Sequence, residues 1–456
     1  MSTFSPALFS GKRFAVVGLG KNGLPAAIGL AAMGADVVAW DDDPAARTAA
    51  LDAIAGADDR AAALASPQGL QVRDPADGPF DFDGLVLSPG IPHRLPKPHK
   101  VAQRAIAAGV PIVSDVELLF QAVRASGSRA RFIGITGTNG KSTTTALLAH
   151  VLEQAGVAVA AGANLGPAAL SLPLLPHDGV YVLEMSSYML ERLVSMRFDV
   201  GIMLNLSSDH IDRHGDMAGY AMAKRAVFDR QTVRDLAVIG TDDSWSRDMA
   251  AWLVQRPARV VCISSAETPL AAGPALPGSH NAQNSAAATA AARFLGISDR
   301  AIAAGLLSYP GLPHRQQRIV TIDGVTYIND SKATNADASE RALVCYDRVV
   351  WIAGGMAKEG GIEPLVPLFP RIARAFLIGR DAAEFGATLS RHGVRFDIAG
   401  TLEAAVPAAF AAAKATGAPI VLLSPACASW DQFTGYDQRG DRFAELARNL
   451  QAGGAA

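Results

Sequence analysis

Residues 134–145 read GITGTNGKSTTT, and this glycine-rich segment constrains the fold more than any other part of the sequence. Gly140, Lys141 and Ser142 match the end of a Walker A phosphate loop, although Ile135 stands where that motif has its first glycine. A strand–loop–helix unit of this kind binds phosphate through successive backbone N–H groups, a lysine, and a hydroxyl that can hold Mg²⁺. The alternative is a glycine turn with a surface lysine, but the apolar run before the loop and the helical segment after it favour a parallel α/β sheet.

Short β-branched runs alternate with helical segments along the chain, which is typical of doubly wound parallel sheets. The 456 residues exceed what one hydrophobic core usually organises, and polar breaks at residues 124–131 and 308–316 divide the pattern. We therefore predict an α/β protein with three domains. They are a Rossmann-like N-terminal domain (1–114), a central P-loop-type ATPase domain (115–311) and a Rossmann-like C-terminal domain (312–456).

Composition argues against several functions. The formal net charge is −2 and the sequence has no Lys/Arg run, so no nucleic-acid partner is expected. The three cysteines lie far apart, which predicts neither a disulfide framework nor a metal cluster and is typical of a reducing cytoplasm. The first residues do not resemble a secretory signal, and no apolar run is long enough for membrane insertion.

A second glycine turn lies near the N-terminus. Gly18, Gly20 and Gly23 follow a predicted strand with G-x-G-x-x-G spacing, and Asp41 ends the next predicted strand. Taken alone, this pattern indicates a NAD site. However, glycines allow any nucleotide diphosphate to approach a helix N-terminus. A dinucleotide redox site, another diphosphate ligand and a structural turn all remain open from these residues.

Several segments resemble the Mur ligases, which form amide bonds with ATP, and more distantly the folylpolyglutamate synthases. The phosphate loop has the Mur pattern G-x-x-G-T-N-G-K-S, and six further segments follow in the family's order: LEMSSYML (183–190), NLSSDHIDRHG (205–215), HNAQN (280–284), GLPHR (311–315), NDSKATN (329–335) and SPACASWDQF (424–433). The last three look most like the branch of the family that adds D-glutamate. Ligases that add the third residue usually carry DYAH and DNPR motifs, which are absent here.

The resemblance implies ATP-dependent addition of D-glutamate to UDP-N-acetylmuramoyl-L-alanine through an acyl phosphate, with release of ADP and phosphate. This reaction belongs to cytoplasmic peptidoglycan precursor synthesis. The implied cofactors are ATP and Mg²⁺, with two ions expected and Mn²⁺ as an alternative, and the implied oligomeric state is a monomer. In such a reaction a carboxylate must approach the γ-phosphate, so Mg²⁺ and lysines have to neutralise two anions.

The resemblance also assigns the ATP and metal residues. ATP is expected on the loop, with adenine, phosphate and ribose contacts beyond it: Gly137, Thr138, Asn139, Gly140, Lys141, Ser142, Thr143, Asn281, Asn284, Arg315 and Asp330. The expected metal residues are Ser142, Glu184, His210 and Lys224. Glu184 lies at a predicted strand end, where α/β active sites gather.

Catalytic roles fall on Lys141, His210, Lys224 and Lys332. From the residues alone, His210 is a structural histidine as readily as a ligand, and His214 lies close by. Lys224 is an ordinary helix-face lysine from the residues alone. By resemblance it is the lysine that adds CO₂ and becomes an anionic carbamate, which requires a depressed amine pKa.

Substrate residues are assigned in the same way. The UDP-sugar is expected at Lys21, Asn22, Asp41 and Ser88, and Asn164 is expected to contact the substrate from the central domain. D-Glutamate is expected at Thr334, Lys358, Ser429, Trp430 and Tyr436. The family commonly has a smaller apolar residue at the position of Trp430 and Phe at that of Tyr436, so these two residues alter the pocket.

Three alternatives remain. A folylpolyglutamate-type ligase fits the three-domain length and the first glycine turn less well. A NAD-dependent oxidoreductase with an accessory P-loop domain leaves Glu184, His210 and the later motifs unexplained. A nucleotide-gated binding protein fits poorly with so many ordered polar motifs. Three domains with sites at their junctions also predict hinge motion around residues 311–315 on ligand binding.

Overall fold

The computed structural model describes residues 3–55, 69–266, 273, 275–357 and 360–453. It confirms a mixed α/β fold built on three large sheets, which lie in residues 13–113, 131–263 and 317–423. Contacts between Cα atoms divide the chain into two compact units, one holding the first two sheets and the other the third. The three predicted domain ranges each contain one sheet, and their boundaries stay a prediction.

The first sheet is fully parallel, with strand order β3-β2-β1-β4-β5. Its elements are β1 (Arg13–Val17), α1 (Gly23–Ala32), β2 (Asp36–Trp40), α2 (Pro44–Ala55), β3 (Leu70–Val72), β4 (Gly84–Leu87), α4 (Lys100–Ala107) and β5 (Ile112–Val113). The strand order reverses between β1 and β4, so the turns that follow these two strands meet at a topological switch point, where α/β sheets bind ligands. Gly18 follows β1 and Ser88 follows β4.

The second sheet is also fully parallel, in the order β11-β10-β9-β6-β8-β7. Its strands are β6 (Arg131–Thr136), β7 (Val159–Ala163), β8 (Val180–Glu184), β9 (Val200–Met203), β10 (Leu236–Gly240) and β11 (Arg259–Ile263). The helical elements are α5 (Asp115–Ala125), α6 (Lys141–Gln154), η1 (Ala169–Ser171), α7 (Ser187–Leu190), α8 (Ile211–His214), α9 (Met217–Arg225), α10 (Ser244–Leu253), α11 (Ser279–Phe294) and α12 (Asp299–Ser308).

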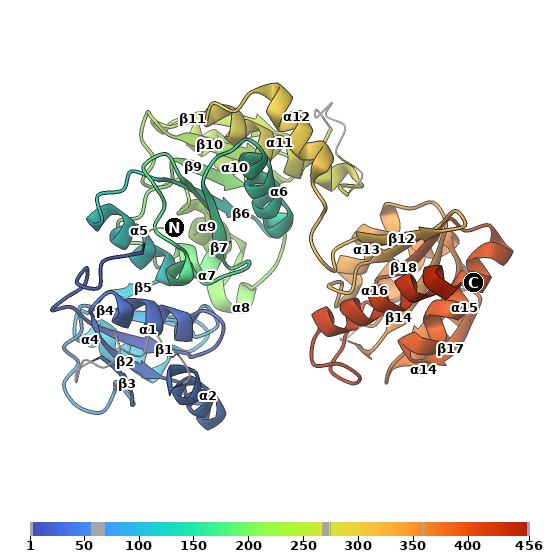
Figure 1. Ribbon diagram of the computed structural model, residues 1–456, viewed down its shortest axis with the longest axis horizontal. Helices are drawn as coiled ribbons and strands as arrows, with labels where there is room; N and C mark the ends of the chain where they lie inside the picture. The colour runs from blue at the N-terminus through green and yellow to red at the C-terminus, as the bar shows by residue number, and fades with distance from the viewer. Residues whose placement is uncertain (1–2, 56–68, 267–272, 274, 358–359, 454–456) are drawn as a thin grey trace. The chain divides into compact units, whose positions relative to one another are not determined.

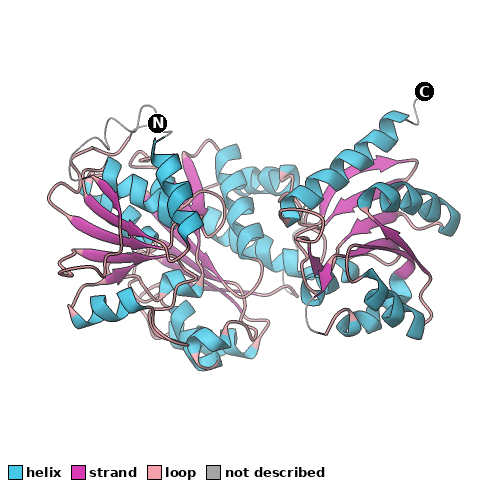
Figure 2. Cartoon of the chain, turned by 90° about the horizontal axis from the view of Figure 1, so that it is seen from below, coloured by secondary structure: helices cyan, strands magenta, loops and turns pink. Residues whose placement is uncertain are grey.

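The third sheet forms the second compact unit, and helices flank its strands (Figures 1 and 2). Its order is β12-β13-β18-β14-β16-β17, in which only β12 runs antiparallel to its neighbour. The strands are β12 (Gln317–Ile322), β13 (Val325–Asn329), β14 (Val349–Gly354), β16 (Ile372–Ile378), β17 (Phe396–Gly400) and β18 (Ile420–Leu423), and β15 (Met356–Ala357) pairs with β19 (Cys427–Ala428). The helices are α13 (Ala336–Val344), η2 (Glu363–Arg371), α14 (Ala382–Arg391), α15 (Leu402–Thr416) and α16 (Tyr436–Gly453).

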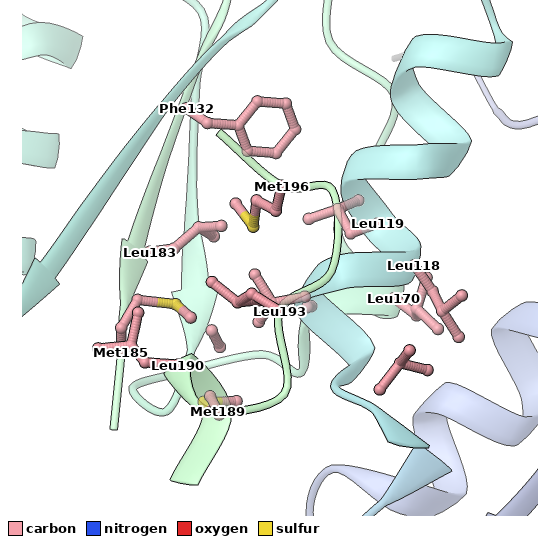
Figure 3. Close-up of a cluster of buried hydrophobic side chains, with 14 of the residues drawn as sticks. Leu118, Leu119, Phe132, Leu170, Leu183, Met185, Met189, Leu190, Leu193 and Met196 are labelled. Atoms are coloured by element: carbon pink, nitrogen blue, oxygen red, sulfur yellow. The ribbon is translucent and has the colours of Figure 1, made fainter. Parts of the chain in front are cut away.

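One continuous core joins the first two sheets. Buried apolar residues run from Phe14 on β1 through Leu119 on α5 to Phe132 on β6. Figure 3 shows Leu119 of α5 facing side chains that follow β8, including Leu193 and Met196. Burial of apolar side chains contributes about 1.5–3 kcal/mol each, so this core holds the first unit together.

Candidate functional site

The glycine-rich segment forms the predicted loop between β6 and α6. Gly137 and Gly140 have φ values of 145° and 84°, which a side chain would strain. The N–H groups of Thr138 and Asn139 donate to the backbone oxygen and the Oδ1 of Asn205, over 2.8 and 2.9 Å. Asn205 follows β9, the neighbour of β6, so the adjacent strand fixes the shape of the loop.

The phosphate-binding groups lie where the loop enters α6. The N–H groups of Lys141, Ser142 and Thr143 belong to the first helical turn and therefore have no intrahelical acceptor. Lys141 folds back over the loop, and its Nζ donates to the carbonyls of Gly137 and Thr138 over 2.9 and 2.8 Å. A helix N-terminus with a lysine across its entrance attracts anionic oxygens.

Lys224 lies on the other side of the same loop. It sits near the end of α9 and is only 1% exposed. Its Nζ donates to Gly137 O over 2.9 Å and to Thr136 Oγ1 over 3.3 Å, and it lies 4.7 Å from the centroid of the Tyr220 ring. Burial, reinforced by the charge of Lys141, holds the pKa of Lys224 well below its usual range. The site therefore favours a neutral amine, which is nucleophilic.

Glu184 ends β8, next to the phosphate-loop strand, and is 3% exposed. Its Oε1 accepts a hydrogen bond from Asn164 Nδ2 over 2.5 Å. Its Oε2 is buried and has no hydrogen-bond partner among the described residues. A buried carboxylate oxygen without a donor costs free energy unless a ligand satisfies it.

A divalent cation fits this environment. Among the described residues, no group of three or more His, Cys, Asp and Glu side chains could enclose a metal ion. Mg²⁺ does not need such a cage, because it commonly binds one or two carboxylates, keeps several waters and takes its other ligands from phosphate. Glu184 Oε2 and the Ser142 hydroxyl are oxygen atoms that could serve as such Mg²⁺ ligands.

His210 and His214 differ sharply in their surroundings. The His210 side chain is 46% exposed, and its residue has a left-handed backbone with φ of 53°. The His214 side chain is 3% exposed and is packed between the rings of Tyr188 and Tyr220, 5.6 and 5.4 Å away. Burial is the main cause that lowers the pKa of His214 to about 4. Of the two, His210 is the one free to meet a ligand.

The first turns of α11 pack against the phosphate loop. Asn284 Nδ2 donates to Asn281 Oδ1 over 2.9 Å, and both side chains are buried. A Cβ atom at Gly140 would collide with Asn284 Oδ1, so the glycine is required for the close approach of α11. The two asparagines therefore lie directly beside the phosphate loop, as expected for residues that contact the nucleotide.

The N-terminal glycine turn occupies the switch point of the first sheet. Gly18 has φ of 91°, and its carbonyl accepts the hydroxyl of Ser88 over 2.7 Å. The Asp41 carboxylate contacts the same turn, because its Oδ2 accepts the N–H of Leu19 over 2.7 Å. Two of the predicted UDP-sugar residues, Asp41 and Ser88, thus contact this glycine turn.

The remaining N-terminal candidates reach the second sheet. Lys21 Nζ donates to Asn164 O over 3.3 Å, while Asn22 Nδ2 lies 3.4 Å from both Asp115 Oδ2 and Ala163 O. Since Asn164 also donates to Glu184, a short chain of contacts connects the N-terminal turn with the candidate metal ligand. The structure brings these predicted residues together within the first unit.

In the second unit, Asp330 follows β13 and is buried. Its Oδ2 accepts the hydroxyl of Ser424 over 2.8 Å and its Oδ1 accepts the N–H of Gln316 over 3.1 Å. Burial raises the pKa of Asp330 to about 7, although these hydrogen bonds and the charge of Arg315 act in the opposite direction. The Nε of Arg315 is buried and has no hydrogen-bond partner among the described residues, so a ligand acceptor suits it.

The amino-acid candidates of the second unit are partly assembled. Lys332 Nζ lies 5.2 Å from the centroid of the Tyr436 ring, within cation–π range. Thr334 follows in the same loop, and Asn335, not Thr334, caps α13. Ser429 is buried, whereas Trp430 is 72% exposed and therefore free to cover a ligand. Lys358 lies outside the described residues.

Three residues that support the site were not predicted from the sequence. Asn205 supports the loop, Tyr220 packs on Lys224, and Arg439 holds the loop of Lys332 through Ser331. Arg439 is buried, and its guanidinium also donates to Cys427 O over 3.0 Å. Two of them could have been found. Asn205 begins the NLSSD segment after a predicted strand, and Arg439 precedes a glycine in YDQRG, and polar residues in such positions often have a function.

The fold and this arrangement define an enzyme of the P-loop class that uses a nucleoside triphosphate. Residues 135–273 match the Mur ligase middle domain. A protein of Paramagnetospirillum magneticum named UDP-N-acetylmuramoylalanine–D-glutamate ligase is 51% identical to this chain, covering 99% of this chain and 100% of the relative. A relative of the same name from Caulobacter vibrioides is 43% identical and is covered to 98%, as is this chain. The chain belongs to the Mur ligase family, whose members are ATP-dependent ligases.

Solved structures agree on the fold. The UDP-N-acetylmuramate–alanine ligase of Thermotoga maritima matches 97% of this chain and 99% of its own with a TM-score of 0.57 at 17% identity. MurF of Acinetobacter baumannii matches 95% of this chain and 93% of its own with a TM-score of 0.55 at 16% identity. At these identities the two structures bear on the fold alone. No helix among the described residues is long and apolar enough to cross a membrane.

Proposed function

We propose that this enzyme joins D-glutamate to UDP-N-acetylmuramoyl-L-alanine at the expense of ATP. The observation that carries the proposal is the 51% identity, over the full length of both chains, to a relative named for this reaction. The SPACASWDQF and NDSKATN segments support the same branch of the family. The partners in this proposal are two small molecules, UDP-N-acetylmuramoyl-L-alanine and D-glutamate, and no nucleic acid is involved.

The proposed reaction has two steps. A carboxylate oxygen of the muramoyl substrate attacks the γ-phosphorus of ATP, the bond to the β-phosphate oxygen breaks, and ADP leaves. The amine of D-glutamate then attacks the carbonyl carbon, the bond to the phosphate oxygen breaks, and phosphate leaves as the amine loses its proton. Lys141 and the amides of the α6 N-terminus are placed to hold phosphate oxygens during the first step.

Mg²⁺ supplies charge neutralisation between the two anions when it is bound. Glu184, Ser142, His210 and Lys224 are the residues that we propose to hold it, with two ions expected and Mn²⁺ as a substitute. The unsatisfied Oε2 of Glu184 supports this role. The 46% exposure of His210 supports its availability as a ligand.

Lys224 is proposed to be carbamylated. Its neutral amine would attack the carbon of CO₂, form an N–C bond and release a proton, which leaves an anionic carbamate. The depressed pKa of Lys224, caused by burial and by Lys141, supports the neutral nucleophile that this step needs. The contacts of the Lys224 amine with Thr136 and Gly137, at the start of the phosphate loop, support this role.

The remaining assignments complete the proposal. Asn281 and Asn284 are proposed to contact adenine, Asp330 the ribose and Arg315 the phosphates. Lys332 is proposed as a catalytic residue. The D-glutamate pocket is proposed to consist of Thr334, Lys358, Ser429, Trp430 and Tyr436. The UDP-sugar is proposed to bind at Lys21, Asn22, Asp41, Ser88 and Asn164. We further propose the domain boundaries near residues 114 and 311, a monomer, and a cytoplasmic location where ATP and UDP-sugars are available.

The test is phosphate release from ATP in the presence of UDP-N-acetylmuramoyl-L-alanine, with D-Glu, L-Glu, Gly and L-Ala assayed in parallel. Release that depends on D-Glu alone is expected. Release with another amino acid would keep the ligase chemistry and would mean that Trp430 or Tyr436 has redirected the pocket. No release with any of the four would contradict the proposed reaction.

A further inference from the structure

Arg192 is a buried arginine that joins the first two sheets. It follows α7 and is 2% exposed. Its guanidinium donates to three backbone carbonyls that follow β4: Nη1 to Leu87 O over 2.8 Å and Ser88 O over 3.3 Å, and Nη2 to Ile91 O over 2.6 Å. Its Nε lies 3.3 Å from His93 Nδ1. One side chain from the second sheet therefore contacts the whole segment 87–93 of the first.

The backbone that carries Arg192 is itself fixed. The Arg192 carbonyl accepts the N–H of Ser114 over 3.3 Å. The carboxylate of Glu117, on α5, accepts the N–H groups of Val194, Ser195 and Met196 over 2.9 to 3.0 Å. A carboxylate that accepts several N–H groups forms strong, directional hydrogen bonds. Arg192 is thus held at its base by α5 and at its tip by segment 87–93.

Segment 87–93 in turn fixes the N-terminal glycine turn. The Ser88 hydroxyl donates to Gly18 O, and a Cβ at Gly18 would lie 2.7 Å from both Ser88 Cβ and Ile91 Cδ1. The turn therefore packs directly on the segment that Arg192 holds. Any shift of residues 88–91 would move the turn where we propose that the UDP-sugar binds.

We propose that Arg192 is a positioning residue for the UDP-linked substrate, which holds segment 87–93 and the glycine turn at 18–23 in register with the second sheet. The inference rests on the proposed function for the identity of the substrate. Arg192 itself does not contact the reacting atoms in this proposal. It acts through Ser88 and Gly18.

The guanidinium suits this task better than another cation would. Its planar fork offers five N–H donors in fixed directions, whereas a lysine has one compact ammonium group. Burial lowers the pKa of Arg192 to about 10, so the side chain still carries its charge at neutral pH. All three of the backbone groups that it contacts are uncharged acceptors, so the interaction fixes geometry without neutralising a partner.

The test compares Arg192→Lys and Arg192→Met with a matched control, Arg124→Met. Arg124 is also partly buried and donates to two backbone carbonyls, Ser128 O and Ala130 O, but it does not reach segment 87–93 in any contact described here. We expect the Arg192 variants to raise the KM for UDP-N-acetylmuramoyl-L-alanine about tenfold, while kcat and the KM values for ATP and D-glutamate change less than about twofold. The control should leave all three KM values near those of the parent enzyme.

A second variant keeps the proposal testable if the Arg192 variants do not fold. His93→Ala removes one acceptor of Arg192 without leaving an unpaired buried charge, and we expect an increase of about threefold in the same KM. Amide hydrogen exchange of residues 87–91, measured without substrate, should become faster in every variant that weakens this contact. Unchanged exchange and unchanged KM in His93→Ala would overturn the proposal, as would an equal KM increase in Arg124→Met.

These readouts separate the two proposals. If the parent enzyme neither binds nor turns over UDP-N-acetylmuramoyl-L-alanine, the proposed function fails, and the exchange experiment still decides whether Arg192 holds the segment. If the parent enzyme turns over this substrate but the KM is insensitive to Arg192 and His93, the positioning role fails alone.

Discussion

The chain uses the strand–glycine turn–helix unit twice within one compact unit, and the two copies are equipped differently. At the N-terminal turn, Asp41 takes the N–H of Leu19 and Lys21 reaches away to Asn164 O. At the phosphate loop, Lys141 and Lys224 both donate to Gly137 O. Similar strand–turn–helix units therefore carry different side chains, which fits the binding role that we propose for the first copy and the reactive role that we propose for the second. The difference lies in the lysines and not in the glycines.

The largest effect is expected for Lys141. Lys141→Met removes a cation from the phosphate loop, and kcat should fall about 10³-fold or more, because the charge of the transferring phosphoryl group is no longer neutralised. Steady-state phosphate release measures this, with circular dichroism to check folding. The KM for the UDP-linked substrate should stay nearly constant. Residual activity within about tenfold of the parent enzyme would remove the contrast between the two turns.

A large loss of kcat is also expected for a substitution of Lys224, and added carboxylates should partly rescue it. Lys224→Ala should lower kcat at least about 10²-fold, because it removes the proposed carbamate. Short carboxylates added to the assay should restore part of the activity by occupying the space of the lost anion. Lys141→Met serves as the control and should not respond to them. Near-normal activity of Lys224→Ala without any rescue would contradict carbamylation.

An exchange of glycine for alanine tests both turns in one experiment. Both Gly18 and Gly140 have positive φ values, 91° and 84°, and an added Cβ would press on Ser88 or on Asn284. Gly140→Ala should raise the KM for ATP about tenfold or more, whereas Gly18→Ala should do so for the UDP-linked substrate. Each variant should change the KM for the other substrate only slightly. If each variant weakened both substrates equally, the two turns would not be separate binding sites.

A smaller effect is expected for Lys21. Lys21→Met removes an exposed donor that binds a backbone carbonyl, and the KM for the UDP-linked substrate should rise about threefold with kcat retained. The matched control is Lys12→Met, because Lys12 pairs with Asp83 on the surface. A loss of kcat comparable with that of Lys141→Met would show that the first turn shares the reactive role.

The smallest effect concerns stability and pH. Burial lowers the pKa values of His93 and His214 from 6.5 to about 4. The native state therefore keeps both rings neutral, while the unfolded chain gains protons below pH 6.5, so stability is complete above pH 6.5 and declines as pH falls towards 4. Each ring should cost about 1 kcal/mol by pH 5 after allowance for solvent screening.

Urea unfolding at pH 7.5 and pH 5 measures this difference. His93→Gln and His214→Gln should each reduce the loss of stability between the two pH values, and the surface residue His177 provides a control substitution. An identical pH dependence in the parent and in both variants would mean that the rings titrate normally in the native state.

The sequence was sufficient for most strands of the three sheets and for the candidate residues that lie next to strand ends. The loop before Lys141, Glu184 at the end of β8 and Ser88 after β4 all follow from apolar runs that stop at polar or glycine residues. Strands β3, β7, β11 and β17 were not predicted. Most residues of β7, VAAGA, are small, and β17, FDIAG, is partly exposed and has one β-branched residue. The sequence of β11, RVVCI, has three β-branched residues, but its exposed positions give no clear alternation.

The burial of individual polar side chains and their long-range contacts could not be predicted from the sequence. Lys224 looks like any lysine on a helix, because its burial depends on how α9 packs against the loop. Arg192 was missed because its acceptors are backbone carbonyls, which every residue possesses and no sequence pattern marks. Leu87 stands 105 positions away from it. The resemblance to a family supplied the role of Lys224, and no feature of the sequence supplied that of Arg192.

The junction at Arg192 limits how this protein can be recombined with its relatives. A chimera that exchanged only residues 13–113, or only residues 131–263, would combine segment 87–93 of one protein with the residue at position 192 of another. Segments 87–93, 114–117 and 192–196 would have to be inherited together for the contacts to survive. For recombination, the first two sheets therefore behave as one module, although each carries its own glycine turn.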